Sequence, residues 1–283
     1  MPNNSLNMRF PEFRSKALTL SYDDAVLEDF RLIDIMKKYG LKGTFNINSA
    51  LYAEADADPD YEGWAHRMSQ KQATELYGGD GIEPAIHALT HANLPTLPSA
   101  QVAYEVLKDR ENLEHQFGRI VRGMAYPYGT LSDEVVSVLR SCGIAYCRTI
   151  VSTERFAIPK DWLRMPATCH HKNPRLQELT NQFLAKQHTV HEEPWLFYLW
   201  GHAYEFKRDN NWEVIEQFGE RIGGKDDIWY ATNIEVYEYV EAFRSLIFTL
   251  DMTQVHNPTA KTLWFILRGN SYRINAGETL ILE

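Results

Sequence analysis

The types and spacing of four side chains point to metal-assisted chemistry. Asp23 and Asp24 are adjacent carboxylates that follow an apolar, β-branched stretch typical of a buried strand. Like charges this close cost energy unless a cation or a shared proton offsets them. His87 and His91 are four residues apart, a spacing that places both imidazoles on one side of a helical turn. One carboxylate and two imidazoles form a usual ligand set for a first-row metal, so the sequence predicts such a site.

Two later polar positions fit the same chemistry. Tyr128 and His202 each follow another apolar stretch of the chain. A divalent metal polarises a carbonyl and lowers the pKa of a bound water, and an uncoordinated carboxylate such as Asp23 can take the proton of that water. A backbone N–H at the Pro-Tyr turn can meet a developing oxyanion, and a histidine can protonate the leaving group. The set therefore favours hydrolysis of an amide or an ester.

The elements that must position these residues alternate between strand and helix patterns. Such alternation implies parallel strands with right-handed crossovers, whose carboxyl ends share one rim. Seven or eight units predict an α/β fold, a distorted (β/α)7-8 TIM-like barrel. The expected strands are 17–22, 42–48, 82–86, 121–125, 144–150, 163–168, 195–200 and 228–231. The expected helices are 25–36, 69–76, 99–117, 132–141, 175–186, 212–222 and 233–244.

The last part of the chain breaks this alternation. Strand patterns at 246–251, 263–267, 272–274 and 279–282 follow one another without helices between them. We therefore expect residues 1–245 to form the barrel and residues 246–283 to form a short antiparallel β appendage packed on it, because so short a segment is marginal as an independent domain.

Charge and composition exclude several partners. The 283 residues carry a net charge of −9, which argues against nucleic acid or an anionic membrane as the main partner. No run approaches 18 apolar residues, so no membrane span is expected. The start of the chain has no signal-peptide pattern, so a cytoplasmic location is expected as the chain stands, although a trimmed secreted chain would read the same way. The cysteines Cys142, Cys147 and Cys169 are expected to be reduced and buried.

At this point the sequence resembles the polysaccharide deacetylase family, the carbohydrate esterases with a NodB-like domain. The resemblance covers most of residues 15–245. An aromatic residue before Asp-Asp, a His-x-x-x-His pair, a Pro-Tyr turn and a late Leu-x-x-His occur in the family's order. The matching segments are Tyr22-Asp23-Asp24-Ala25, His87 to His91, Pro127-Tyr128-Gly129 and Leu199-Trp200-Gly201-His202.

The resemblance implies a role for each matched residue. Asp23 would be the general base, His202 the general acid, and Tyr128 would offer its backbone N–H to the oxyanion. Asp24, His87 and His91 would hold a divalent ion, zinc first, with cobalt, nickel or manganese as alternatives. The partner would be an acetylated carbohydrate; the oligomeric state is not implied. The expected substrate contacts are Leu199, Tyr126, Trp162 and Arg164.

The sequence departs from the family pattern in its supporting residues. Ala88 follows the first metal histidine where the family often has a hydroxyl residue, unless Thr90 serves instead. Ala125 takes the place of an arginine that orients the base in the family, and we expect Arg164 to replace it. The family's fourth motif is only hinted at by Asp161-Trp162.

Several residues stay open between a functional and a structural role. His170 and His171 either line the cleft or belong to a polar loop. Glu205 either orients His202 or is a solvated loop carboxylate. An Asp-Asp pair after a strand is by itself more often a helix N-cap, and core packing is the commoner role of a single tryptophan such as Trp162.

The leading hypothesis is a metal-dependent removal of N-acetyl or O-acetyl groups from a carbohydrate. The first alternative is a metal-dependent hydrolase of another non-peptide C–N bond, such as a small amide, because barrels host many chemistries. The second is a non-catalytic carbohydrate-binding relative, which the absent motif arginine at Ala125 favours.

Overall fold

A computed structural model describes residues 6–58 and 60–282, and its centre is one parallel sheet curled into a distorted barrel. The strands lie in the order β7-β6-β5-β4-β3-β2-β9-β8, and β10 also pairs with β2; every pairing in this sheet is parallel. The predicted fold class is confirmed. The strands are β2 Lys16–Asp23, β3 Gly43–Ile47, β4 Ile82–Ile86, β5 Gly123–Ala125, β6 Tyr146–Ser152, β7 Met165–Ala167, β8 Cys169–His170, β9 Trp195–Gly201 and β10 Ile228–Tyr230.

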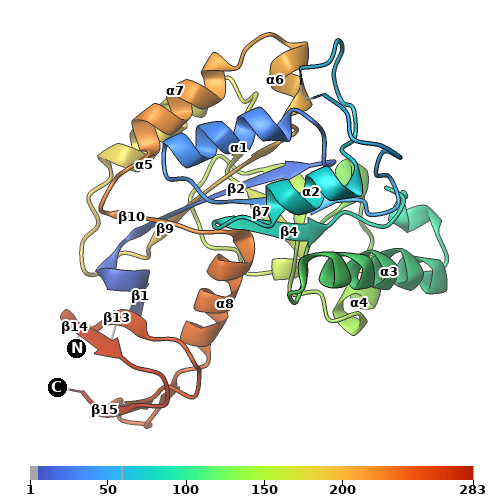
Figure 1. Ribbon diagram of the computed structural model, residues 1–283. Helices are drawn as coiled ribbons and strands as arrows, with labels where there is room; N and C mark the ends of the chain where they lie inside the picture. Colours follow the sequence, from blue (N-terminus) through green and yellow to red (C-terminus); the bar gives the residue numbers. More distant parts are fainter. Residues whose placement is uncertain (1–5, 59, 283) are drawn as a thin grey trace.

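Helices follow most of these strands and cover the outside of the barrel (Figure 1). They are α1 Asp29–Lys38, α2 Gln70–Tyr77, α3 Ser99–Phe117, α4 Asp133–Ser141, α5 Leu176–Ala185, α6 Tyr204–Arg208, α7 Glu213–Ile222 and α8 Asn233–Arg244. Ser69 and Thr232 cap α2 and α8. In each case the cap side chain accepts from the N–H of the third helical residue, and the side chain of that residue accepts from the N–H of the cap. None of the helices in the described ranges is long and apolar enough to cross a membrane.

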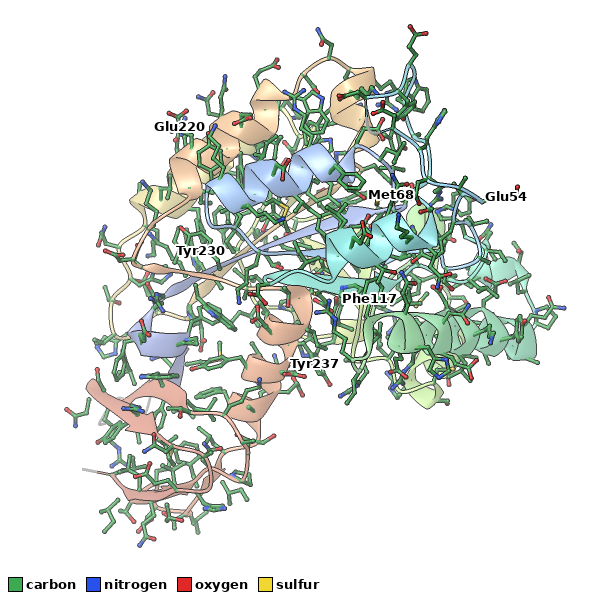
Figure 2. The ribbon with its side chains drawn as sticks, viewed as in Figure 1. Glu54, Met68, Phe117, Glu220, Tyr230 and Tyr237 are labelled. Carbon is green, nitrogen blue, oxygen red and sulfur yellow. The ribbon has the colours of Figure 1, made fainter. Side chains whose placement is uncertain are left out.

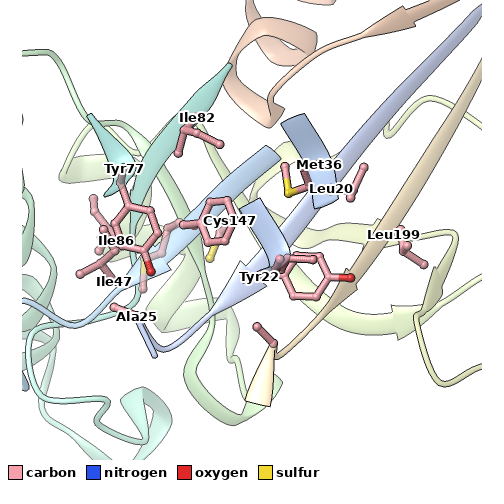
Figure 3. Packing of buried hydrophobic residues seen from close by; sticks show 14 of the residues in the cluster. Leu20, Tyr22, Ala25, Met36, Ile47, Tyr77, Ile82, Ile86, Cys147 and Leu199 are labelled. Carbon is pink, nitrogen blue, oxygen red and sulfur yellow. The ribbon is translucent and has the colours of Figure 1, made fainter. Parts of the chain in front are cut away.

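The barrel interior is held together by apolar side chains from strands and helices. Every residue of β2 is buried, as expected for a parallel strand covered on both faces. Leu20 on β2 lies in register with Leu199 on β9, and Met36 of α1 belongs to the same cluster (Figure 3). These contacts fix where β2 and β9 end, and therefore where Asp23 and His202 are presented.

The antiparallel appendage contains two small sheets (Figure 1). One has the order β1-β13-β14 and the other β11-β12-β15. The strands are β1 Leu6–Arg9, β11 Ile247–Phe248, β12 Gln254–His256, β13 Leu263–Leu267, β14 Asn270–Ile274 and β15 Thr279–Ile281. Residues near the start of the chain thus join the appendage through antiparallel pairing of β1 with β13, a long-range contact that the sequence pattern did not predict.

A second apolar cluster seals the appendage to the barrel. It includes Met8 of β1, Phe265 of β13 and Val240 of α8. Tyr237, which projects from α8 (Figure 2), packs edge-on against Trp162 with ring centroids 5.3 Å apart. Trp162 therefore belongs to this structural cluster.

Local differences from the expected elements have identifiable causes. The expected strand 163–168 is divided into a 3₁₀ turn at Trp162–Arg164, β7 and β8. The helix expected from residue 25 begins only at Asp29, because Asp24 and Ala25 have positive φ angles of 88° and 52°. A short helix, α6, forms where the sequence indicated a loop.

Candidate active site and metal centre

The two carboxylates lie at a sharp backbone turn where β2 leaves the barrel. Asp24 has φ 88°, and its N–H donates to the Asn46 carbonyl at 3.0 Å, so the chain turns before α1 begins. The pair is therefore not the N-cap of α1. Non-glycine residues with positive φ are uncommon and cluster at functional sites. The turn separates the two side chains, leaving Asp23 buried while the side chain of Asp24 is 15% exposed.

Asp23 is held ionised by a buried cation. Its Oδ2 pairs with the Arg148 guanidinium, and its Oδ1 accepts a 2.8 Å hydrogen bond from the amide of Asn46. Burial raises the pKa of Asp23, but the charge and hydrogen bond of Arg148, together with the nearby His87 and His202, outweigh it and lower that pKa to about 2. Arg148 is itself buried, with its guanidinium 4.2 Å from the centre of the Trp200 ring. The carboxylate is thus charged, oriented and available as a base at neutral pH.

Asp24, His87 and His91 bring three potential metal ligands together. One ligand atom from each lies within 4.8 Å of the others, and His91 Nε2 is 3.8 Å from Asp24 Oδ1. His87 Nδ1 lies 2.8 Å from the Ala125 carbonyl, which can only accept, so Nδ1 carries the proton and Nε2 keeps its lone pair. Burial lowers the pKa of His87, and burial together with the nearby His87 lowers that of His91 to about 4, so both rings are neutral, as ligands must be. This donor set fits a divalent metal.

The two metal-site histidines lie on a loop rather than on a helical turn. Ala88 and His91 have positive φ angles of 59° and 55°, so the prediction that a helical turn carries the two histidines is wrong. Both imidazoles still converge. Asn48 donates to the Ala88 carbonyl at 2.7 Å, and Asp109 accepts from the His87 N–H at 3.1 Å. The Asn48 bond satisfies a loop carbonyl, and the Asp109 bond adds to the one that the His87 N–H donates to the Ile47 carbonyl of β3 at 2.9 Å, so the loop is anchored on both sides.

Two neighbouring polar residues fall outside the expectation. Arg67 donates to Asp24 Oδ1 at 2.9 Å and also bonds the Asp24 carbonyl, which adds a second cation beside the carboxylates. Thr90 was left open as a substitute for the hydroxyl missing at Ala88. Its hydroxyl donates to Glu105 at 2.8 Å, so it braces the loop.

His202 directly follows β9 and lies close to both carboxylates. Its Nε2 is 3.8 Å from Asp23 Oδ2 and 3.9 Å from Asp24 Oδ2, and its Nδ1 is 3.4 Å from Glu205 Oε2. Burial lowers the pKa of His202, but the bond to Glu205 and the charges of Asp23 and Asp24 outweigh it and leave that pKa raised. A histidine with a raised pKa keeps its proton near neutrality, as a general acid must.

Tyr128 lies beside the candidate metal ligands. It belongs to the tight turn Pro127–Gly129 with φ 58°, and its ring, 62% exposed, meets the His91 ring edge-on with centroids 4.4 Å apart. The Tyr128 ring therefore lies at the same opening as His91. The side chains of His91 and His202 are 20% and 23% exposed, so a substrate can reach both.

The structure corrects the expectation about the orienting arginine. Arg164 pairs with Asp133 and Asp161 on the surface, whereas Arg148 contacts Asp23. Arg148 lies on β6 in direct register with Ala125 on β5, so the guanidinium comes from the neighbouring strand. A charged residue between the buried Cys147 and Thr149 of this strand was the available signal, and sequence reasoning missed it.

Three expected substrate contacts lie in the protein interior. Leu199 is fully buried in the barrel core. The Tyr126 hydroxyl donates to the Leu163 carbonyl at 2.8 Å, and the Trp162 indole donates to Glu241 at the same distance. Trp162 and Tyr126 therefore act in packing, and neither presents a free polar group to the cleft.

Comparison with known proteins connects part of the chain to one family. Residues 11–147 match the family model described as polysaccharide deacetylase. A curated chitooligosaccharide deacetylase from Azorhizobium caulinodans is 28% identical over 106 residues, which are 37% of this chain and 43% of that protein. The chain therefore matches less than half the length of this relative.

Solved structures extend the likeness to the fold. A Mycobacterium smegmatis protein named for the polysaccharide deacetylases has 15% identity, a TM-score of 0.58 and coverage of 86% of this chain and 96% of that one. A CE4 family pseudoenzyme from Bacillus anthracis has 18% identity, a TM-score of 0.49 and coverage of 82% and 68%. The resemblance to the polysaccharide deacetylases seen in the sequence is thus confirmed over residues 11–147, just under half of the chain.

Proposed function

We propose that the protein is a metal-dependent deacetylase that hydrolyses N-acetyl or O-acetyl groups on a carbohydrate. The observation that carries the proposal is the convergence of Asp23, paired with Arg148, and His202 beside the three candidate ligands Asp24, His87 and His91. The name of the Azorhizobium caulinodans relative supports an N-acetylated sugar as the substrate class.

A divalent ion would supply a Lewis acid and a water of lowered pKa when bound. Zinc suits a ligand set of two imidazoles and one carboxylate. The side chains of this chain do the rest. Asp23 accepts the proton of the attacking water through Oδ2, the oxygen that lies 4.0 Å from His87 Nε2 and 3.8 Å from His202 Nε2. Arg148 keeps Asp23 ionised until that moment, because its charge opposes the effect of burial.

The second half of the reaction falls to the other rim residues. The Tyr128 N–H, in the tight turn Pro127–Gly129, would stabilise the developing oxyanion. His202 Nε2 then gives its proton to the departing nitrogen or oxygen as the bond to the acetyl carbon breaks. Glu205 accepts a hydrogen bond from His202 Nδ1, so Nδ1 keeps its proton and Nε2 is the atom that gives up the transferable one.

The non-catalytic alternative loses its main support. It rested on the absent arginine at position 125, and Arg148 supplies a guanidinium to Asp23 from the adjacent strand. The alternative of another amide substrate is tested by substrate range, because the same constellation can hydrolyse any accessible amide.

The test is acetate release from N-acetylated chitooligosaccharides, O-acetylated glycans and small amides, measured with zinc-loaded and chelator-treated protein. The proposal expects release from an acetylated sugar, loss with chelator and recovery with added metal. Turnover of the small amides alone would assign the first alternative, and binding of glycans without any turnover would assign the second.

A further inference from the structure

The leaving-group side of the site contains a second group of histidines that the proposed reaction does not yet use. His170 and His171 follow one another at the end of β8, and Glu205 comes from α6. Oxygen Oε2 of Glu205 lies 3.1 Å from His170 Nε2, 3.3 Å from His171 Nε2 and 3.4 Å from His202 Nδ1. Three imidazoles therefore converge on one carboxylate oxygen.

The other oxygen of this carboxylate faces two cations. Glu205 Oε1 lies 3.4 Å from Arg208 and 3.7 Å from Lys172. Burial would raise the pKa of Glu205, but its contacts to His170, His171 and His202 lower it far below the usual range. The carboxylate is thus ionised and held from several sides.

Two histidines and one carboxylate also have the composition of a metal site. The hydrogen bonding of His170 argues against that use. The Lys172 N–H donates to His170 Nδ1 at 3.1 Å, so in the neutral ring Nδ1 keeps its lone pair and the proton lies on Nε2. Nε2 is the atom that faces Glu205, and a protonated nitrogen donates a hydrogen bond rather than binding a metal. His87 has the opposite arrangement, with Nδ1 facing an acceptor and Nε2 free.

The position of His171 is fixed by close packing. Its side chain is 1% exposed, and its ring stacks between Phe206 at 4.1 Å and Tyr22 at 5.8 Å, measured between ring centroids. Gly201 leaves the space for it, because a Cβ at position 201 would collide with the imidazole. His171 therefore sets a rigid wall behind Glu205.

We propose that His170 and His171 are positioning residues for the leaving-group half of the reaction, clamping Glu205 so that its Oε2 stays aligned with His202 Nδ1. This proposal rests on the proposed deacetylase function. Without the clamp, Glu205 turns toward Lys172 and Arg208, and the N–H at His202 Nδ1 loses its acceptor, so Nε2 is no longer fixed as the atom that gives up the transferable proton. Neither His170 nor His171 touches the reacting atoms.

The chemistry predicts which substrates need the clamp. When the bond between the acetyl carbon and a sugar nitrogen breaks, the electron pair goes to nitrogen and the proton of His202 Nε2 must follow it. An aryl acetate releases a stable phenolate, whose leaving oxygen needs no proton. Loss of acid positioning should therefore slow N-acetyl sugar hydrolysis and spare an aryl acetate such as 4-nitrophenyl acetate.

The experiment compares Glu205→Gln and His170→Ala with the wild type on both substrates, and uses His188→Ala as the matched control. His188 packs edge-on against Trp195 and has no role in the cluster. We expect Glu205→Gln to lower kcat on the N-acetyl sugar by roughly 10- to 100-fold, less than the roughly 10²- to 10⁴-fold of a complete general acid because His202 itself remains. His170→Ala should lower it by a smaller factor. Both variants should change aryl acetate turnover by less than about threefold, with unchanged zinc content.

Three results would overturn the proposal. Equal losses on the two substrates would mean that the cluster supports the whole site rather than the acid. Full sugar activity in His170→Ala would mean that His170 holds nothing in place. A second zinc per wild-type chain, lost in His170→Ala, would assign the cluster as a metal site.

A readout independent of turnover separates this proposal from the deacetylase assignment. In nitrogen NMR of the histidine rings, the clamp predicts that His202 carries a proton on Nδ1 in the wild type and shifts tautomer population in Glu205→Gln and His170→Ala but not in His188→Ala. If the wild type hydrolyses neither substrate yet shows these shifts, the proposed function fails while the clamp stands. Unchanged His202 signals would refute the clamp in either case.

Discussion

Replacing Arg148 by methionine tests whether the guanidinium keeps Asp23 ionised. Methionine keeps the bulk and flexibility of the side chain and removes the charge. In the folded chain the pKa of Asp23 is about 2, against 3.8 for the ordinary carboxyl. That difference corresponds to about 2 kcal/mol of folding stability, because one pKa unit equals about 1.4 kcal/mol.

The sign of this contribution follows from the direction of the shift. A depressed pKa stabilises the fold above the unfolded value of 3.8, and the contribution is lost as the pH falls toward 2. In Arg148→Met nothing comparable opposes burial, so the pKa of Asp23 rises above its ordinary value and its ionisation now destabilises the fold. Breaking a buried ion pair in this way costs roughly 3–5 kcal/mol at neutral pH.

The assay is urea unfolding of chelator-treated protein at pH 7.5 and pH 4.5. We expect Arg148→Met to be less stable than the wild type at pH 7.5, with a smaller difference at pH 4.5 because Asp23 becomes protonated in the variant. Asp23→Asn combined with Arg148→Met should recover part of the loss, since no buried charge remains. The metal-loaded variant should also lose most of its turnover.

Arg164→Met is the matched control. Arg164 forms exposed ion pairs with Asp133 and Asp161, which contribute no more than about 1 kcal/mol. If Arg148→Met costs no more than Arg164→Met, or if its cost is the same at both pH values, the reasoning about the buried pair is refuted.

Further predictions concern the residues around the ion. Asp23→Asn should keep its zinc and lower kcat by roughly 10²- to 10⁴-fold, and normal turnover would assign the base to another group. His91→Ala should lose zinc, measured by metal analysis, while circular dichroism stays that of the folded barrel; stoichiometric zinc at normal affinity would remove His91 from the ligand set. Because Glu205 helps to raise the pKa of His202, Glu205→Gln should move the basic limb of the pH–rate profile to lower pH, and an unmoved limb would mean that the limb belongs to another group.

The fold and the central site follow from short-range patterns in the chain. Alternating strand and helix signals indicate parallel strands, and parallel strands place their carboxyl ends on one rim. Asp23, Asp24, His87 and His202 could therefore be expected together, and the structure brings them together. The roles assigned to them remain predictions.

The supporting residues could not be read in the same way. Arg148 reaches Asp23 because β5 and β6 pair in a particular register, which local sequence does not reveal. The turn between His87 and His91 is set by bonds from distant Asn48 and Asp109, which override the helical spacing. Pairing of β1 with β13 likewise joins segments more than 250 residues apart in the chain, as Leu6 opposite Leu267 shows.

The most direct test of the central claim is metal-dependent acetate release. Zinc content and acetate release from N-acetylated chitooligosaccharides should be measured together on the wild type, on chelator-treated protein and on Asp24→Asn. We expect one zinc per chain, together with turnover, in the wild type. Zinc and turnover should both be lost after chelation and in Asp24→Asn. Adding zinc should restore them only in the chelated wild type. Full acetate release from metal-free wild-type protein would contradict it.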